Sequence, residues 1–185
     1  KCIVNQREIG SDTESFSVAF TYVLRQDPDV ILIGDTRDLE TIAAAITLAE
    51  TGHLVFATLH TMDAASSINR MVDVFPGHQQ AQIRSQLSLA LKAVFSQNLL
   101  PNISGKGMIL VSEIMLVNDS VKNIIREMRT EQLYSVIQTN RHSGMQTMNQ
   151  SLVENVMKGK ISPKKAIEYS TRKDELIKLL QDNIR

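Results

Sequence analysis

Two short apolar runs, with a helix-length segment between them, constrain the fold of this chain most strongly. Residues 30–33 (Val-Ile-Leu-Ile) and 54–59 (Leu-Val-Phe-Ala-Thr-Leu) are rich in β-branched and aromatic side chains, a composition typical of strands buried on both faces. Asp38 can cap a helix between the runs, and Gly52 can end it. Strands that alternate with helices form βαβ units, so we expect an α/β fold with a mostly parallel sheet flanked by helices.

The same alternation continues to residue 118 and then stops. The spacing of apolar residues predicts further helices over 16–24, 63–72 and 79–97, and further strands over 97–100 and 108–116. Beyond that point it predicts only short helices, at residues 121–128, 131–138, 145–157, 163–169 and 174–184. We therefore expect an α/β core over residues 1–118, followed by a small all-α subdomain over residues 119–185.

Composition argues against several classes of protein. Among the 185 residues, 20 Lys and Arg balance 20 Asp and Glu, whereas a general nucleic-acid binder carries a basic excess. No apolar run approaches the ~20 residues of a membrane-spanning helix. Cys2 is the single cysteine, which excludes an internal disulfide and favours a reducing cytoplasm. The chain starts at Lys1 without a signal-peptide pattern, and we expect it to be the back part of a longer protein.

Polar side chains follow both predicted strands of the βαβ unit. Asp35 comes after the first strand, and His60 ends the second. In an open α/β sheet the ligand crevice lies at the carboxyl ends of the strands, so we expect Asp35 and His60 to meet on a common rim. A carboxylate at the end of an apolar strand has the form of a Walker B element. There it serves the magnesium ion or the attacking water of a nucleoside triphosphatase.

Each of these residues also has a structural alternative. Asp35 or Asp38 can simply cap the next helix, and His60 can close a strand end instead of contacting a γ-phosphate. His53 lies about 23 Å from His60 at the rise of a strand, so the two cannot share a metal ion. We expect His53 to be structural or to serve an interface. Glu8 can orient a metal-bound water or pair with an arginine.

Arginine side chains can neutralise transition-state charge on a phosphoryl group. Several arginines are distributed over the first half of the chain: Arg7, Arg25, Arg37, Arg70 and Arg84. Composition alone does not choose among them. The chain contains no GxxxxGK[ST] sequence, so the backbone cradle that holds phosphates in such enzymes is missing from these 185 residues.

Several blocks, in the same order, resemble the secretion ATPases, which are the hexameric motors of type IV pili and type II secretion. These blocks are residues 4–10 (VNQREIG), 24–34 (LRQDPDVILIG), 37–41 (RDLET), 50–55 (ETGHLV) and 58–61 (TLHT). Four later blocks are similar to the pilus-retraction branch of this family: residues 72–76 (VDVFP), 123–127 (NIIRE), 134–138 (YSVIQ) and 144–148 (GMQTM). The resemblance extends through about residue 160 of the chain.

This resemblance implies a RecA-like P-loop NTPase core that hydrolyses ATP with Mg²⁺. It further implies a homo-hexamer at the cytoplasmic face of the inner membrane, an inner-membrane pilus platform protein as partner, and pilus retraction as the work done. In full-length members a sensor-like domain, the phosphate loop and an Asp box come before the position of Lys1. The chain alone is therefore expected to be inactive.

The resemblance also assigns roles to particular residues. It implies catalytic roles for Asp35, Glu8 and His60, and nucleotide contacts for Arg25, Arg37, His53 and Thr61. It places the short helix needed for retraction, and not for hydrolysis, at Asn123, Ile124, Ile125, Arg126 and Glu127.

Two positions depart from the family pattern. Asp35 stands where the family usually has Glu, and Thr21 stands where members commonly have Arg. A shorter acid and a lost arginine at the subunit junction would both lower turnover. The alternative is therefore a catalytically impaired paralogue that acts as a docking or assembly subunit of a pilus or secretion machine.

Overall fold

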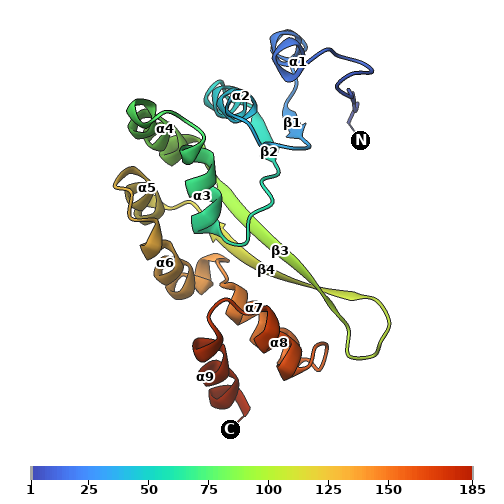
Figure 1. Cartoon of the computed structure of the whole chain (residues 1–185), viewed down its shortest axis with the longest axis vertical. Coiled ribbons are helices and arrows are strands. Elements are labelled where there is room, and N and C mark those ends of the chain that lie inside the picture. The colour runs from blue at the N-terminus through green and yellow to red at the C-terminus, as the bar shows by residue number, and fades with distance from the viewer. Residues whose placement is uncertain (1, 185) are drawn as a thin grey trace. The chain divides into compact units, whose positions relative to one another are not determined.

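A parallel pair of strands with a helix between them forms the first part of the fold. The structure is a computed structural model that describes residues 2–184. β1 (Val30–Ile33) pairs with β2 (Leu54–Ala57) in parallel, with Val30 opposite Leu54 and Ile33 opposite Ala57. α2 (Leu39–Glu50) lies between them in the chain (Figure 1). The predicted βαβ unit is therefore confirmed, although β2 ends at Ala57 and not at Leu59.

Local interactions fix both ends of α2 as the sequence predicts. The Asp38 carboxylate accepts a hydrogen bond from the Thr41 N–H at 2.9 Å, which satisfies a backbone donor that has no partner inside the helix. After the helix, Gly52 takes a φ of +101°, a conformation that a residue with a Cβ rarely adopts. The chain turns there and enters β2.

The other elements follow in the predicted order. α1 (Phe16–Val23) precedes β1, and α3 (Ala64–Asp73) and α4 (Gly77–Ala90) follow β2. The hairpin of β3 (Ala93–Pro101) and β4 (Met108–Leu116) comes next. The chain then continues as α5 (Asp119–Arg126), α6 (Leu133–Thr139), α7 (Met148–Met157), α8 (Pro163–Tyr169) and α9 (Lys173–Ile184), with 3₁₀ turns at Thr130–Gln132 and Arg141–Ser143. The short helices predicted beyond residue 118 are confirmed.

β3 and β4 are antiparallel, which differs from the mostly parallel sheet expected from the sequence. Their register runs from Ala93 opposite Leu116 to Pro101 opposite Met108. The connection explains the difference, because a parallel crossover needs a dozen or more residues and only residues 102–107 join these strands. Among the described strands, the parallel arrangement holds for β1 and β2.

The helix predicted over residues 79–97 is too long. α4 ends at Ala90, and Leu91 is already extended, with φ of −62° and ψ of 131°. Val94 continues the helical spacing in the sequence but lies in β3, where it pairs with Met115. Pairing with β4 overrides the local helical spacing, so the strand begins at Ala93 and not at Gln97.

The strands of the βαβ unit are less buried than predicted. Ile33 is buried, but Val30 and Leu32 on β1 are exposed, as are Leu54 and Phe56 on β2. The register places Val30 opposite Leu54 and Leu32 opposite Phe56, so these four side chains share one face of the strand pair. The expectation of burial on both faces is therefore wrong for this face in the described residues.

The chain divides into two compact units. One contains residues up to His60 together with Arg70–Leu91, and the other contains Thr61–Asn69 together with residues from Lys92 onward. The hairpin belongs to the second unit because α7 packs on β4. These divisions differ from a boundary near residue 118, which stays a prediction. Its outer limits, Lys1 and Arg185, lie outside the described residues.

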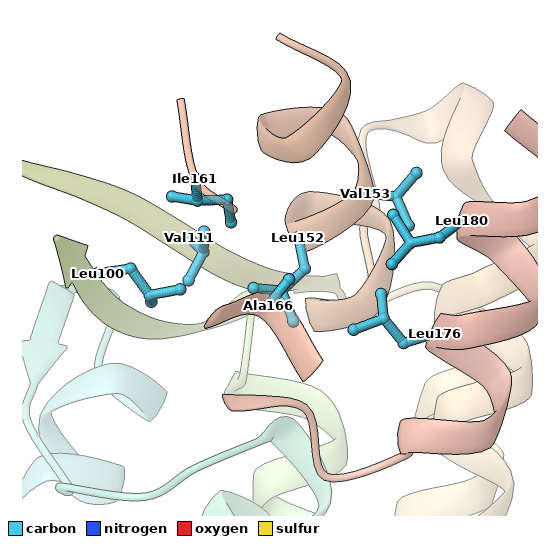
Figure 2. Close-up of a cluster of buried hydrophobic side chains, with 8 residues drawn as sticks. All are labelled: Leu100, Val111, Leu152, Val153, Ile161, Ala166, Leu176 and Leu180. Carbon is cyan, nitrogen blue, oxygen red and sulfur yellow. The ribbon is translucent and has the colours of Figure 1, made fainter. Parts of the chain in front are cut away.

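A hydrophobic cluster organises the second unit. Leu100 and Val111 come from the hairpin, and Leu152 comes from α7, each with 0% of its surface exposed. Figure 2 shows these side chains converging with others from the helical part of the chain: Val153, Ile161, Ala166, Leu176 and Leu180. Burial of this cluster fixes the hairpin, α7, α8 and α9 as one body.

Candidate functional site

The segments that follow β1 and β2 are held together beyond the ends of the strands. The Thr36 N–H donates to the Thr58 carbonyl oxygen at 3.1 Å, and the Thr36 hydroxyl donates to the same oxygen. The Thr58 hydroxyl donates to the Gly34 carbonyl at 2.5 Å. These bonds fix the backbone on both sides of Asp35 and just before His60. Both segments leave the strands at the same edge because the strands are parallel.

Asp35 and His60 lie close together at this edge. The His60 Nε2 atom is 3.9 Å from the Asp35 Oδ1 atom. Both side chains are accessible, with 44% of the Asp35 side chain and 64% of the His60 side chain exposed. The predicted meeting of the two residues on a common rim is confirmed. A carboxylate and an imidazole in this arrangement can accept, donate or relay a proton at a molecule bound between them and the solvent.

The backbone at His60 is strained. Its φ is +52°, in the left-handed region that residues other than glycine seldom occupy. Such a conformation costs about 1–2 kcal/mol and persists where the surrounding structure fixes it. This strain sits at the residue that faces Asp35.

The sequence allowed either Asp35 or Asp38 to cap the next helix, and the structure shows that Asp38 caps it. Its carboxylate accepts hydrogen bonds from the backbone N–H and the hydroxyl of Thr41. The Thr41 N–H bond is the largest cause that lowers the pKa of Asp38 below its ordinary value of 3.8. Asp35 makes no such cap. It pairs with Arg37 across 2.8 Å, so its carboxylate stays at the rim.

The other residues predicted to bind nucleotide or act in catalysis are less closely placed. Arg37 contacts Asp35, whereas the Arg25 side chain is exposed and makes no ion pair with the described residues. Glu8 lies in a turn in which its backbone N–H donates to Asp12 at 2.9 Å. Within residues 2–184, no hydrogen bond or ion pair joins the Glu8 side chain to Asp35 or His60. The functional roles of these three residues stay predictions.

His53 and Thr61 both have partners within the fold. The His53 Nδ1 atom lies 3.2 Å from the Leu48 carbonyl and 3.1 Å from the Thr51 hydroxyl, so the ring closes the end of α2. This geometry fits the structural alternative for His53. The Thr61 hydroxyl lies 2.5 Å from the Ser67 hydroxyl, within the second unit. A nucleotide contact for either residue stays a prediction.

The helix assigned to retraction has one buried and one exposed side. Ile124 and Ile125 are buried in the core of the second unit, whereas Asn123, Arg126 and Glu127 are exposed. Arg126 donates to the Asn123 side chain, which holds both groups on the surface of α5. Only the exposed three can contact a partner directly. The two isoleucines are buried and anchor the helix in the core.

Two threonines at the site were missed by sequence reasoning. Thr36 had no assigned role, and Thr58 was named only within a sequence block, yet their hydroxyls join the two post-strand segments. The available signal was a hydroxyl residue one or three positions after each strand, where backbone groups leave the sheet and need new partners. Thr36 is also buried, with 1% of its surface exposed.

The residues at the rim fit a magnesium ion only as part of a larger site. Asp35 offers one carboxylate with the oxygen chemistry that Mg²⁺ prefers, and Mg²⁺ is commonly held by one or two carboxylates together with substrate phosphates. Within the described range, no three His, Cys, Asp or Glu side chains come together as a metal site. Among residues 2–184, no helix is both long and apolar enough to cross a membrane.

Comparison with known proteins identifies the class to which this fold and site belong. Residues 4–106 match the family model described as "Type II/IV secretion system protein". This match covers more than half of the chain, and the chain belongs to that family. Its architecture is the RecA-like α/β fold of the secretion ATPases.

Individual relatives match over almost the whole chain. The chain is 52% identical over 166 residues to the twitching motility protein of Neisseria gonorrhoeae, which is 90% of this chain and 44% of that protein. It is 52% identical over 168 residues to the type IV pilus retractation ATPase PilT of Pseudomonas aeruginosa, which is 91% of this chain and 48% of that protein. The crystal structure of the pilus retraction motor PilT with bound ADP superposes with a TM-score of 0.87 at 48% identity, over 95% of this chain and 49% of that one. The chain thus spans about half the length of the relatives it matches.

Proposed function

We propose that the protein containing this chain hydrolyses ATP to drive retraction of type IV pili. The observation that carries the proposal is the 3.9 Å approach of Asp35 and His60 at the ends of two parallel strands. This is the edge of an α/β sheet where ligands bind. The similarity to a twitching motility protein and a pilus retractation ATPase extends through the helical part of the chain, which favours the retraction branch.

The residues at the rim have distinct proposed roles. The Asp35 carboxylate orients the attacking water and accepts its proton as the water oxygen bonds to the γ-phosphorus, while the bond from the γ-phosphorus to the bridging oxygen breaks and ADP leaves. The His60 imidazole donates a hydrogen bond to the γ-phosphate oxygens. Glu8 assists in orienting the water, and Arg25, Arg37, His53 and Thr61 contact the nucleotide. Asp35 is the residue here that would hold Mg²⁺, which would supply positive charge to neutralise the phosphates of the nucleotide.

The assembly is also part of the proposal. The protein acts as a homo-hexamer, on the cytoplasmic side where ATP is available, peripheral to the inner membrane. Its partner is the inner-membrane platform protein of the pilus. The exposed residues Asn123 and Arg126 of α5, with Glu127 at its C-terminal end, are the proposed contact for transmitting motion, since Ile124 and Ile125 between them are buried.

Phosphate release by the full-length protein tests the proposal. Steady-state release of phosphate from ATP should depend on Mg²⁺ and should stop in EDTA, and a strain that lacks the gene should lose twitching. A purified wild-type protein that releases no phosphate with Mg²⁺, under conditions in which its ring is assembled, would contradict the assignment.

A second candidate is a catalytically impaired paralogue that docks onto a pilus or secretion machine. Asp35, which is one methylene shorter than the family's usual Glu, favours this alternative. So does Thr21, whose hydroxyl donates to the Ser17 carbonyl at 3.0 Å and carries no charge. The double variant Asp35→Glu with Thr21→Arg separates the two. A large gain in phosphate release over an inactive wild type supports the paralogue, and ample wild-type release removes it.

A further inference from the structure

Glu113 is a charged residue in the buried face of a strand. It lies on β4 between Val111 and Met115, which have 0% of their surfaces exposed, and only 4% of Glu113 itself is exposed. Its Oε1 atom accepts a hydrogen bond from the Ala64 N–H at 2.9 Å. Ala64 is the first residue of α3 and is fully buried. The bond therefore joins β4 to the start of a helix 49 positions earlier in the chain.

Burial makes the ionised form of this carboxylate energetically unfavourable. Loss of water is the largest cause that raises the pKa of Glu113, and the charge of Asp63 acts in the same direction. The backbone N–H groups of Ala64 and Met148 and the charge of Arg172 act in the opposite direction, although Glu113 makes no ion pair among the described residues. A buried carboxylate needs hydrogen-bond donors, and it binds backbone N–H groups that an apolar side chain could not. The closer of these donors is the Ala64 N–H, the first of α3, at 2.9 Å, and the other belongs to Met148, the first residue of α7.

The backbone that Glu113 holds is a short, heavily hydrogen-bonded segment. The Asp63 carboxylate accepts from the Ser66 N–H at 2.7 Å, and the Asp63 carbonyl accepts from the Ser67 hydroxyl at 2.8 Å. The Ser67 hydroxyl also lies 2.5 Å from that of Thr61. Residues 61–67 thus form one capped helix start, and Thr61 is bonded directly to His60 in the chain.

We propose that Glu113 is a positioning residue for hydrolysis: by holding the first N–H of α3 it fixes the segment 61–64 and so the backbone that follows His60. The proposal rests on the proposed function, because it concerns the placement of His60 in the reaction. Its ligand is this chain's own helix start, and Glu113 does not itself touch the nucleotide.

Two variants of Glu113 in the full-length protein test the proposal. Glu113→Gln keeps an acceptor oxygen for the Ala64 N–H, whereas Glu113→Ala removes it. Glu113 lines a cavity of about 500 Å³, so water can enter the space that the alanine leaves. Glu131→Ala is the matched control, since Glu131 lines the same cavity but is exposed, and its side chain makes no hydrogen bond within residues 2–184.

Two measurements decide the outcome. Amide hydrogen exchange of residues 62–66 should rise about tenfold in Glu113→Ala and stay near wild type in Glu113→Gln and Glu131→Ala. The kcat for ATP should fall by about tenfold or more in Glu113→Ala, with the KM changed less than about threefold, and Glu113→Gln should restore most of it.

The contrary results are equally specific. Wild-type kcat in Glu113→Ala, or the same kcat loss in Glu113→Gln as in Glu113→Ala, would overturn the proposal. A wild-type protein without phosphate release contradicts the proposed function instead, and unchanged exchange at residues 62–66 in Glu113→Ala overturns the positioning role independently of any activity.

Discussion

Asp35 and Asp38 are three residues apart and have different partners. The Asp38 carboxylate bonds to the backbone and hydroxyl of Thr41 and stabilises α2. The Asp35 carboxylate bonds to the Arg37 side chain and faces His60. Position in the chain decides the role: Asp35, two residues after the end of β1, lies on the rim, and Asp38, directly before α2, caps that helix.

Removal of the Asp38 cap should destabilise the chain measurably. We expect Asp38→Ala to lower the free energy of unfolding by about 1 kcal/mol at pH 7, because the Thr41 N–H loses its acceptor. Asp38→Asn keeps an acceptor and should stay close to wild type at that pH. Urea unfolding of the three proteins checks both values. Equal stability of the Ala variant and wild type would contradict the capping role.

The same residue predicts a pH dependence. The pKa of Asp38 is lower in the folded chain than its ordinary value of 3.8, so its stabilising contribution is present above 3.8 and is lost as the pH falls through the folded-state pKa. Asp38→Asn does not titrate. Wild type should therefore lose stability relative to Asp38→Asn when the pH drops from 5 to 3, measured by urea unfolding at each pH, whereas parallel curves would count against the assignment.

Residue roles that depend on nearby positions, or on a pair of strands recognised in the sequence, could be predicted. Roles that depend on other long-range contacts could not. The Asp38 cap depends on a residue three positions away, and the Asp35–His60 approach follows once two neighbouring parallel strands are recognised. Glu113 contacts Ala64, 49 positions earlier, and the spacing within β4 does not indicate which helix it meets. The Thr36–Thr58 bonds were missed for a similar reason, since they depend on register beyond the strand ends.

At the scale of elements, α5 separates a supporting side from a contact side. Ile125→Ala should lower the free energy of unfolding by about 2–5 kcal/mol, because Ile125 is fully buried and a cavity would replace its side chain. Arg126→Ala should leave the circular dichroism spectrum and stability near wild type, because Arg126 is exposed.

Assays in cells complete the test of α5. Under the proposed function, Arg126→Ala abolishes retraction while phosphate release by the purified protein continues. Lys122→Ala, on the same helix, is a control for removal of a positive charge. Twitching retained in the Arg126 variant would remove α5 from the proposed partner contact.

The sequence predicts whether a segment is a helix or a strand more accurately than it predicts the residue at which the segment ends. The periodicity of the sequence predicts α2, α8 and the helices around them, since their caps and apolar faces are local. The end of α4 was predicted seven residues too late, because Val94 fits a helical stripe and a strand equally well. Only its pairing with Met115 decides between them, and that pairing is a tertiary contact.

At the scale of the whole molecule, the chain carries one rim of the proposed nucleotide site. It spans about half the length of its relatives, and its 185 residues contain no GxxxxGK[ST] sequence. Without backbone N–H groups to cradle the phosphates, binding of Mg-ATP to this chain alone should be weaker than micromolar. Isothermal titration calorimetry checks this, and micromolar affinity would mean that phosphates are held by residues other than those proposed.

The most direct measurement is the kcat for ATP of full-length protein carrying Asp35→Asn, with nucleotide binding measured in parallel. The asparagine preserves the size of the side chain but cannot accept the proton of the attacking water. We predict a loss of about a hundredfold or more in kcat and a much smaller loss of nucleotide affinity, because Asn keeps an oxygen for Mg²⁺ but not the negative charge. Asp38→Asn, which keeps the cap of α2, serves as the control and should turn over at the wild-type rate. Turnover by Asp35→Asn within about twofold of wild type would contradict the assignment of Asp35 as the catalytic acid–base group.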